Sequence, residues 1–220
     1  METIDIFRSN ELFQALNEPE LQHLAELATQ RTVPKNTMVI SAGDMSSSMY
    51  LIKSGMVNVL VANDEGREMI LATLQAGDHF GELSLLDEAP RSANVLTLDK
   101  CEFIILHREE FYKLLEHNPM ISIRVIKYLC QRVRFITNIA QGLALLDVYG
   151  RLLRLLNSLA QQTADGKMVI NIPLTHKDIA SRVGSSREMI SRIFSELEKG
   201  EYVSVEHKII TLHKKLPLAW

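Results

Sequence analysis

Two different periods of hydrophobic residues divide this chain. Between Thr32 and about His107, short apolar runs are separated by turn residues such as Gly43-Asp44 and Gly77-Asp78. These runs predict strands at residues 37–40, 49–52, 57–61, 69–72, 93–97 and 101–106. Many short strands at close spacing are typical of a jelly roll or a barrel. Ahead of them, residues 10–29 predict short helices, one of which begins after Asn17 as its N-cap.

After Pro119 the period becomes helical and remains so to about Leu146. Apolar residues recur there at alternating steps of three and four, with polar residues on either side. This seam consists of Ile126, Leu129, Val133, Ile136, Ala140 and Leu143. A narrow heptad seam usually meets an identical seam on a partner helix, so the pattern predicts a homodimer. The alternative is a long helix that lies on the core of its own domain.

The remaining residues alternate between helical and extended patterns. We expect a helix at about 148–161, a strand at 169–172, helices at 176–183 and 186–198, and a hairpin of 203–206 and 209–212. Thr175 should cap the helix at 176–183, and Ser185 or Ser186 should cap the helix at 186–198. Gly184 should have a positive φ between the two helices. The core between the two helices should consist of Ile179, Ala180, Val183, Ile190 and Ile193. This is the spacing of a helix-turn-helix, and the hairpin after it stands where a wing would be.

Polar residues occupy the start of the helix predicted at 186–198. In a helix-turn-helix, this is the end of the second helix that enters the major groove. Arg187 can donate two hydrogen bonds to guanine, Glu188 can accept one from cytosine, and Arg192 lies one turn further along. Candidates for phosphate contacts are Thr175, Lys177 and Ser186. A solvated face of Arg and Glu is the alternative for any single helix. The helix pair, the turn glycine and the hairpin together favour DNA binding.

Composition and charge narrow the possibilities further. Of 220 residues, 46% are hydrophobic and 23% charged, which is typical of a globular protein. Neither a membrane-spanning apolar run nor a basic leader at the start is found, so we expect a cytoplasmic protein. The two cysteines, Cys101 and Cys130, argue against a disulfide framework and a zinc or iron–sulfur site. The net charge is −3, but the residues from Val148 onward hold 11 basic and 7 acidic side chains, which suits a polyanionic partner.

A second motif interrupts the strands between Gly77 and Ala93. A glycine followed by a short helical turn exposes backbone N–H groups that suit a phosphate. Arg91 adds a fixed positive charge with a planar donor fork, and the Glu82 carboxylate can accept a hydrogen bond from a ribose hydroxyl. These features predict a nucleotide pocket for a single phosphate. The alternative is a loop with a surface ion pair from Arg91 to Glu82 or Glu88.

The stretch from Phe80-Gly81-Glu82-Leu83 to Pro90-Arg91-Ser92-Ala93 resembles the phosphate-binding cassette of cyclic-nucleotide-binding domains. Together with Leu146-Asp147-Val148-Tyr149-Gly150-Arg151 and Val183-Gly184-Ser185-Ser186-Arg187-Glu188, it resembles the catabolite activator (cyclic AMP receptor) family of bacterial transcription regulators. The resemblance covers essentially the whole chain and implies an α+β fold. Its parts would be a jelly roll with N-terminal helices at 1–118, a dimerisation helix at 119–146 and a winged helix-turn-helix at 147–220.

The resemblance also assigns roles to residues. The nucleotide would be bound by Gly81, Glu82, Leu83, Ser84, Arg91, Ser92, Ile136 and Thr137. Arg187, Glu188 and Arg192 match the residues that read bases, which implies palindromic DNA with half-sites similar to TGTGA. His176 and Lys177 match phosphate-contacting residues. The family further implies cyclic AMP as the first candidate effector, RNA polymerase as a partner, and neither a metal, a covalent cofactor nor an enzymatic activity.

The sequence departs from the family at the base-contacting pair. Cyclic-AMP-responsive members carry two adjacent hydroxyl residues where this chain has Ile136 and Thr137, and isoleucine cannot hydrogen-bond the adenine amino group. The alternatives are another nucleotide, a haem-bound gas with His79 or His107 as ligand, or binding of DNA without an effector. An enzyme acting on nucleotides is a further alternative, but the seven histidines form no metal-binding cluster. Activation and repression of transcription both stay open.

Overall fold

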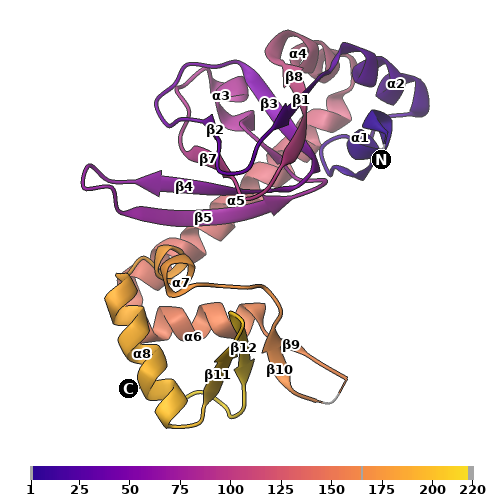
Figure 1. Ribbon diagram of the computed structural model, residues 1–220. Coiled ribbons are helices and arrows are strands. Elements are labelled where there is room, and N and C mark those ends of the chain that lie inside the picture. Colours follow the sequence, from indigo (N-terminus) through magenta and orange to yellow (C-terminus); the bar gives the residue numbers. More distant parts are fainter. Residues whose placement is uncertain (1, 165, 218–220) are drawn as a thin grey trace. The chain divides into compact units, whose positions relative to one another are not determined.

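The computed structural model describes residues 2–164 and 166–217 (Figure 1). Its contacts divide the chain into two compact units. The first unit contains the residues up to Val61 together with 70–134, and the second contains 62–69 and the residues from Phe135 onward. Within the described ranges, no helix combines the length and the apolar content that crossing a bilayer requires.

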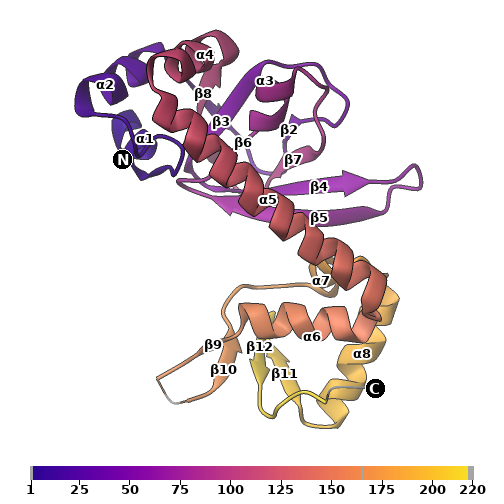
Figure 2. The ribbon, with the colours of Figure 1, turned by 180° about the vertical axis from the view of Figure 1, so that it is seen from behind.

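The first unit is built from two four-stranded sheets, with the strand orders β1-β8-β3-β6 and β2-β7-β4-β5 (Figures 1 and 2). The strands are β1 (Thr29–Val33), β2 (Met38–Ile40), β3 (Ser48–Ser54), β4 (Met56–Ala62), β5 (Glu68–Gln75), β6 (His79–Phe80), β7 (Asn94–Thr97) and β8 (Cys101–His107). The short helices are α1 (Thr3–Ser9), α2 (Glu18–Leu27), α3 (Glu82–Asp87) and α4 (Arg108–His117). The predicted jelly roll is confirmed.

Strand β3 is buried on both faces, because alternate side chains pack into two different hydrophobic clusters. Tyr50 and Ile52 point into the cluster between the two sheets, where Tyr50 stacks on Phe80 at a centroid distance of 5.1 Å. Met49 and Leu51 point to the other side, into a cluster shared with the N-terminal helices and α4. The sheet that contains β3 is therefore the middle layer of this unit.

Several elements of the first unit differ from the prediction. Of the short helices expected at 10–29, only α2 is present; residues 11–15 form turns instead, and α1 lies ahead of the expected range and was not predicted. Strand β1 has one buried residue among its five, and β6 has two residues, so neither shows an apolar alternation long enough to be recognised. Helix α4 buries only Phe111 and starts without a side-chain cap. In contrast, Asn17 caps α2 as predicted, in a reciprocal capping box with Glu20.

The long helix α5 (Pro119–Leu145) confirms the predicted helical segment. In its first half, Ile121 and Val125 are buried in the cluster of α1, α2 and α4, and Leu129 packs against that cluster. The other seam residues remain exposed, with exposed fractions of 59% for Ile126, 64% for Val133, 51% for Ile136 and 43% for Leu143. Ala140 is exposed as well. The alternative, in which the seam lies on the core of its own domain, therefore holds for Leu129 but not for the five exposed seam residues.

The second unit is a winged helix-turn-helix, as predicted. Its elements are α6 (Val148–Leu159), β9 (Gln161–Gln162), β10 (Met168–Ile170), α7 (His176–Val183), α8 (Arg187–Lys199), β11 (Val203–Glu206) and β12 (Ile209–Leu212). The strands form one sheet in the order β11-β12-β10-β9. The strand expected at 169–172 ends at Ile170, since Ile172 is half exposed and leaves the core. The short strand β9 pairs with β10 and was not predicted.

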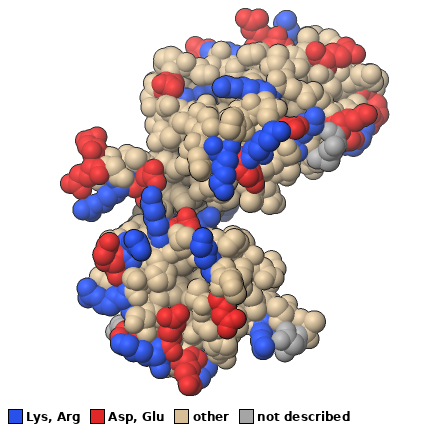
Figure 3. Space-filling model, in the orientation of Figure 1, with Lys and Arg blue, Asp and Glu red and all other residues tan. Residues whose placement is uncertain are grey.

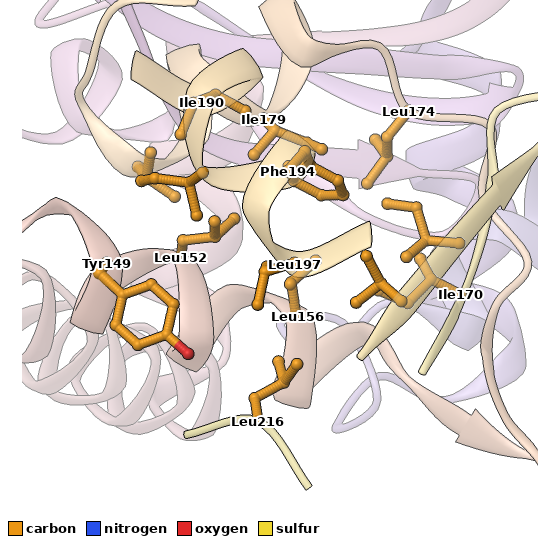
Figure 4. Close-up of a cluster of buried hydrophobic side chains, with 14 of the residues drawn as sticks. Tyr149, Leu152, Leu156, Ile170, Leu174, Ile179, Ile190, Phe194, Leu197 and Leu216 are labelled. Atoms are coloured by element: carbon orange, nitrogen blue, oxygen red, sulfur yellow. The ribbon is translucent and has the colours of Figure 1, made fainter. Parts of the chain in front are cut away.

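Leucine and isoleucine side chains from α6, α7 and α8 converge on one core (Figure 4). The five residues predicted to lie between α7 and α8 are all buried. Leu152 and Leu156 of α6 and Ile170 of β10 are completely buried in the same cluster. Burial of each such side chain stabilises the fold by about 1.5–3 kcal/mol. The helix pair therefore has a rigid base from which α8 projects its polar face.

Candidate functional site

Gly81 begins the first candidate site, because it starts α3 in the left-handed conformation. Its φ is +81°, and a Cβ at this position would lie 2.6 Å from Nη1 of Arg91. Only glycine allows both the turn and this close approach. The Gly81 carbonyl accepts a hydrogen bond from Arg91 Nη1 at 2.6 Å. The glycine thus brings the arginine, ten residues later in the chain, against the start of the helix.

Arg91 is 4% exposed and is held entirely by uncharged oxygens. Its Nη2 donates to the carbonyl of Ser48 at 2.6 Å and to the hydroxyl of Ser46 at 2.8 Å. Burial lowers the pKa of the guanidinium, while Tyr50 and then Glu82 oppose this change. The predicted alternative, a surface ion pair of Arg91, is wrong: Glu88 instead pairs with Arg108 at 3.0 Å. A buried cation held in this way is preorganised for an anion.

Glu82 is the second buried charge of the site, with 5% exposure. One of its oxygens, Oε1, accepts a hydrogen bond from the hydroxyl of Tyr128 at 3.0 Å. Burial raises the pKa of Glu82; hydrogen bonds from its own backbone and from Tyr128, together with the charges of Arg132 and Arg91, oppose the rise. Sequence reasoning missed Tyr128, because nothing in the heptad pattern distinguishes it from a packing residue.

The structure places the other candidate nucleotide residues in two groups. Ser84 is buried on α3, Leu83 is half-buried and Ser92 is exposed beside Arg91. Ile136 and Thr137 belong to the second compact unit, and both are exposed. The two histidines considered as haem ligands make hydrogen bonds through Nδ1, His79 with Asn10 and His107 with Ser48.

The second candidate site is the start of α8. Gly184 ends α7 at a φ of +65°, and Ser186 caps α8 by accepting a hydrogen bond from the Met189 N–H at 3.2 Å. Both features were predicted. Arg151, to which the sequence assigned no role, donates from Nε to the Val183 carbonyl at 2.7 Å and from Nη1 to the Leu146 carbonyl at 2.8 Å. It fastens the turn between α7 and α8 to the start of α6.

The candidate DNA-contacting residues differ in how free their side chains are. Exposed side chains are those of Lys177, Ser186, Arg187, Glu188 and Arg192. The Thr175 hydroxyl donates to Asp178 at 2.6 Å as part of the capping box that starts α7. His176 is half-buried, with its ring against Phe194 and Nδ1 beside the Ser191 hydroxyl. These two residues have structural roles in the helix pair, in addition to the predicted phosphate contacts.

Charges of both signs are interspersed over the face drawn in Figure 3, which presents no patch of a single sign. On this face, the basic residues of the last part of the sequence do not form a single positive patch. The positive charge near the start of α8 comes from a few exposed side chains, Arg187 and Arg192 on α8 itself and Lys177 on the neighbouring helix. Contacts with DNA would depend on these few side chains more than on the net charge of the unit.

Comparisons with known protein families match both parts of the chain. Residues 30–118 match the cyclic nucleotide-binding domain, and residues 150–216 match the Crp-like helix-turn-helix domain. The chain is 33% identical over 202 residues to the cAMP-activated global transcriptional regulator CRP of Salmonella typhimurium, a match that covers 89% of this chain and 95% of the relative. It is 34% identical over 206 residues to the cAMP-activated global transcriptional regulator Vfr of Pseudomonas aeruginosa, covering 88% of this chain and 95% of Vfr.

Solved structures agree in fold. The global regulator CLP of Xanthomonas campestris, described as responsive to c-di-GMP, superposes with a TM-score of 0.78 at 24% identity, covering 90% of this chain and 100% of CLP. The catabolite activator protein of Thermus thermophilus superposes with a TM-score of 0.55 at 26% identity, covering 94% of this chain and 95% of that chain. These likenesses confirm the predicted combination of a jelly roll, a long helix and a winged helix-turn-helix.

Proposed function

Because the chain belongs to the CRP family of cyclic-nucleotide-binding transcription regulators, we propose that it is a homodimer whose binding to palindromic DNA is controlled by cyclic AMP. The observation that carries the proposal is the pair of buried, oppositely charged side chains beside α3, Arg91 and Glu82. A cyclic nucleotide has one phosphate anion and one free ribose hydroxyl, which are the complementary groups.

The phosphate would take the place of the counterion that Arg91 lacks. Among the described residues, no carboxylate lies within ion-pairing distance of this guanidinium, although burial makes an unpaired charge unfavourable. The N–H groups at the start of α3 have no side-chain cap and would be available to a phosphate there. We assign the phosphate to Gly81, Leu83, Ser84, Arg91 and Ser92, and the ribose hydroxyl to Glu82.

Sequence reading is assigned to the exposed start of α8. Arg187 has the planar fork that matches guanine, and Glu188 can accept from the cytosine of the same or the next base pair. With Arg192 they would read half-sites similar to TGTGA. Lys177 and Ser186, together with Thr175 and His176, would contact phosphates and determine the position of the helix on the duplex.

The exposed seam of α5 supports a second copy of this chain as the partner. Four large apolar side chains at heptad positions are 43–64% exposed, and they continue one stripe. An identical stripe from a second copy would cover them. To bind a palindrome, such a dimer would need its two copies of α8 about 34 Å apart, one turn of DNA. RNA polymerase is proposed as a further partner and the cytoplasm as the location, since the relatives are named as transcriptional regulators.

A second candidate function keeps the DNA binding and changes the effector. The observation that favours it is Ile136, whose exposed side chain cannot hydrogen-bond a base. Under this alternative, another nucleotide would occupy the site or the dimer would bind DNA without any effector. No catalytic step is assigned under either candidate.

A gel-shift titration tests the proposal. The full chain is titrated against a duplex with a TGTGA palindrome at a single salt concentration, with and without cyclic AMP, because phosphate contacts make the affinity salt-dependent. We expect tight binding only with the nucleotide. Equal binding in both conditions would support the second candidate, and no preference for the palindrome over a scrambled duplex would contradict the assignment of α8.

A further inference from the structure

The carboxylate of Glu82 is held from outside its own loop by a residue of the long helix. The Tyr128 hydroxyl donates to Glu82 Oε1 at 3.0 Å, although the two residues are 46 positions apart in the sequence. Tyr128 packs against the hydrophobic cluster that also anchors the start of α5, so its ring has little freedom. Figure 2 shows α3 and the first half of α5 in the same part of the first unit.

The Tyr128 ring packs against His79, which is in turn held by Asn10. The His79 and Tyr128 rings lie 4.5 Å apart between centroids, tilted by 50°. The buried amide of Asn10 accepts from the Leu12 N–H through Oδ1, so its Nδ2 is the atom that donates to the Gly77 carbonyl at 2.8 Å and to His79 Nδ1 at 3.1 Å. His79 Nδ1 is consequently an acceptor, and the ring proton resides on Nε2.

Burial keeps His79 and Tyr128 each in one protonation state at physiological pH. Burial lowers the pKa of His79 to about 4, so the ring is neutral at physiological pH. Burial, and then the negative charge of Glu82, raises the pKa of Tyr128 well above its ordinary value, so the phenol stays protonated and remains a donor. The Tyr128 hydroxyl is therefore able to donate to Glu82 Oε1 at physiological pH.

We propose that Tyr128 is a positioning residue for Glu82: its hydroxyl holds Oε1, so that Oε2 is oriented to accept the ribose hydroxyl of the nucleotide. This inference rests on the proposed function of the site. Asn10 and His79 support Tyr128 from behind, which connects the N-terminal segment to the ligand. Since Tyr128 lies on α5, the orientation of the carboxylate also depends on the helix that carries the seam.

The test compares two ligands that differ in one hydroxyl. Affinities of the full chain for cyclic AMP and for its 2′-deoxy analogue are measured by calorimetry, in the natural protein and in Tyr128→Phe. We expect Tyr128→Phe to bind cyclic AMP about tenfold more weakly, as for the loss of a hydrogen bond to a charged group. Its affinity for the 2′-deoxy analogue should change less than about twofold, because that ligand has no hydroxyl for Glu82.

Tyr112→Phe is the matched control. Its hydroxyl also donates within this unit, to the Leu86 carbonyl at 2.9 Å, but it does not touch Glu82. This variant should bind both ligands like the natural protein. An equal loss for both ligands in Tyr128→Phe would show a merely structural role and overturn the proposal. A gain for cyclic AMP would also overturn it, because the phenol would then compete with the ribose.

A second measurement separates the failure of this inference from the failure of the proposed function. The pKa of Glu82 is followed by carbon-13 NMR of its carboxyl group in the ligand-free protein, with Glu82→Gln used to assign the signal. Loss of the donor in Tyr128→Phe should raise this pKa, since the anion loses a hydrogen bond. An unchanged pKa would overturn the positioning role even in a protein that binds no cyclic nucleotide. Absence of binding by the natural protein would contradict only the proposed effector.

Discussion

Replacement of Gly81 by alanine tests whether the close approach of Arg91 organises the nucleotide site. Alanine at a φ of +81° costs about 1–2 kcal/mol of stability from the backbone alone. The new Cβ would also lie 2.6 Å from Arg91 Nη1, 3.2 Å from the Ser48 carbonyl oxygen and 3.3 Å from Ile40 Cδ1. Overpacking of this kind typically costs a further 1–3 kcal/mol. We therefore expect a loss of about 2–5 kcal/mol in the free energy of unfolding.

Gly43→Ala is the control that isolates the clash. Gly43 lies in the same unit at a φ of +89°, and a Cβ there would meet nothing within 4 Å. It should cost only the backbone contribution, about 1–2 kcal/mol. Urea unfolding followed by circular dichroism measures both stabilities, and calorimetry measures binding of cyclic AMP. Gly81→Ala should also lose affinity for the nucleotide, because Arg91 must move. Equal stabilities of the two variants, with natural binding by both, would refute the reasoning.

Three other predictions test the remaining parts of the proposal. Arg187→Ala should abolish the preference for the TGTGA palindrome in gel shifts and leave calorimetric binding of cyclic AMP unchanged; undiminished operator affinity would contradict the role of α8. Val133→Asp, which places a charge in the exposed seam, should convert a dimer to a monomer in analytical ultracentrifugation, while an unchanged mass would exclude the seam as the interface. Folding lowers the pKa of His79 to about 4, so below pH 6.5 the unfolded chain binds more protons than the folded chain. The free energy of unfolding should therefore fall by up to about 3 kcal/mol as the pH decreases to 4. Urea unfolding at pH 7 and 4.5 should show a smaller decrease in the free energy of unfolding for His79→Gln than for the natural protein. An equal decrease in both would contradict the assignment of this pH dependence to His79.

Local signals in the sequence predicted most of the second unit and the long helix. Caps act within one turn of a helix, so Asn17, Thr175 and Ser186 could be recognised without knowledge of the fold, and each caps a helix in the structure. Gly184 was expected at a positive φ for a similar reason. Strand β1 and helix α4 escaped prediction because one buries a single residue and the other only Phe111. Their places depend on the neighbours that they cover.

The sequence by itself determined which chemical groups the nucleotide site contains, because Gly81, Glu82 and Arg91 belong to one short motif. It left open whether these charges pair at the surface. The tertiary structure decided that both are buried, that Arg91 is held by carbonyl oxygens and that Glu82 is held by Tyr128. The physical reason is that burial and hydrogen-bond partners are properties of residues that are distant in sequence and meet only in the folded chain. A motif specifies the donors and acceptors of a site, and the packing around them specifies their charge and orientation.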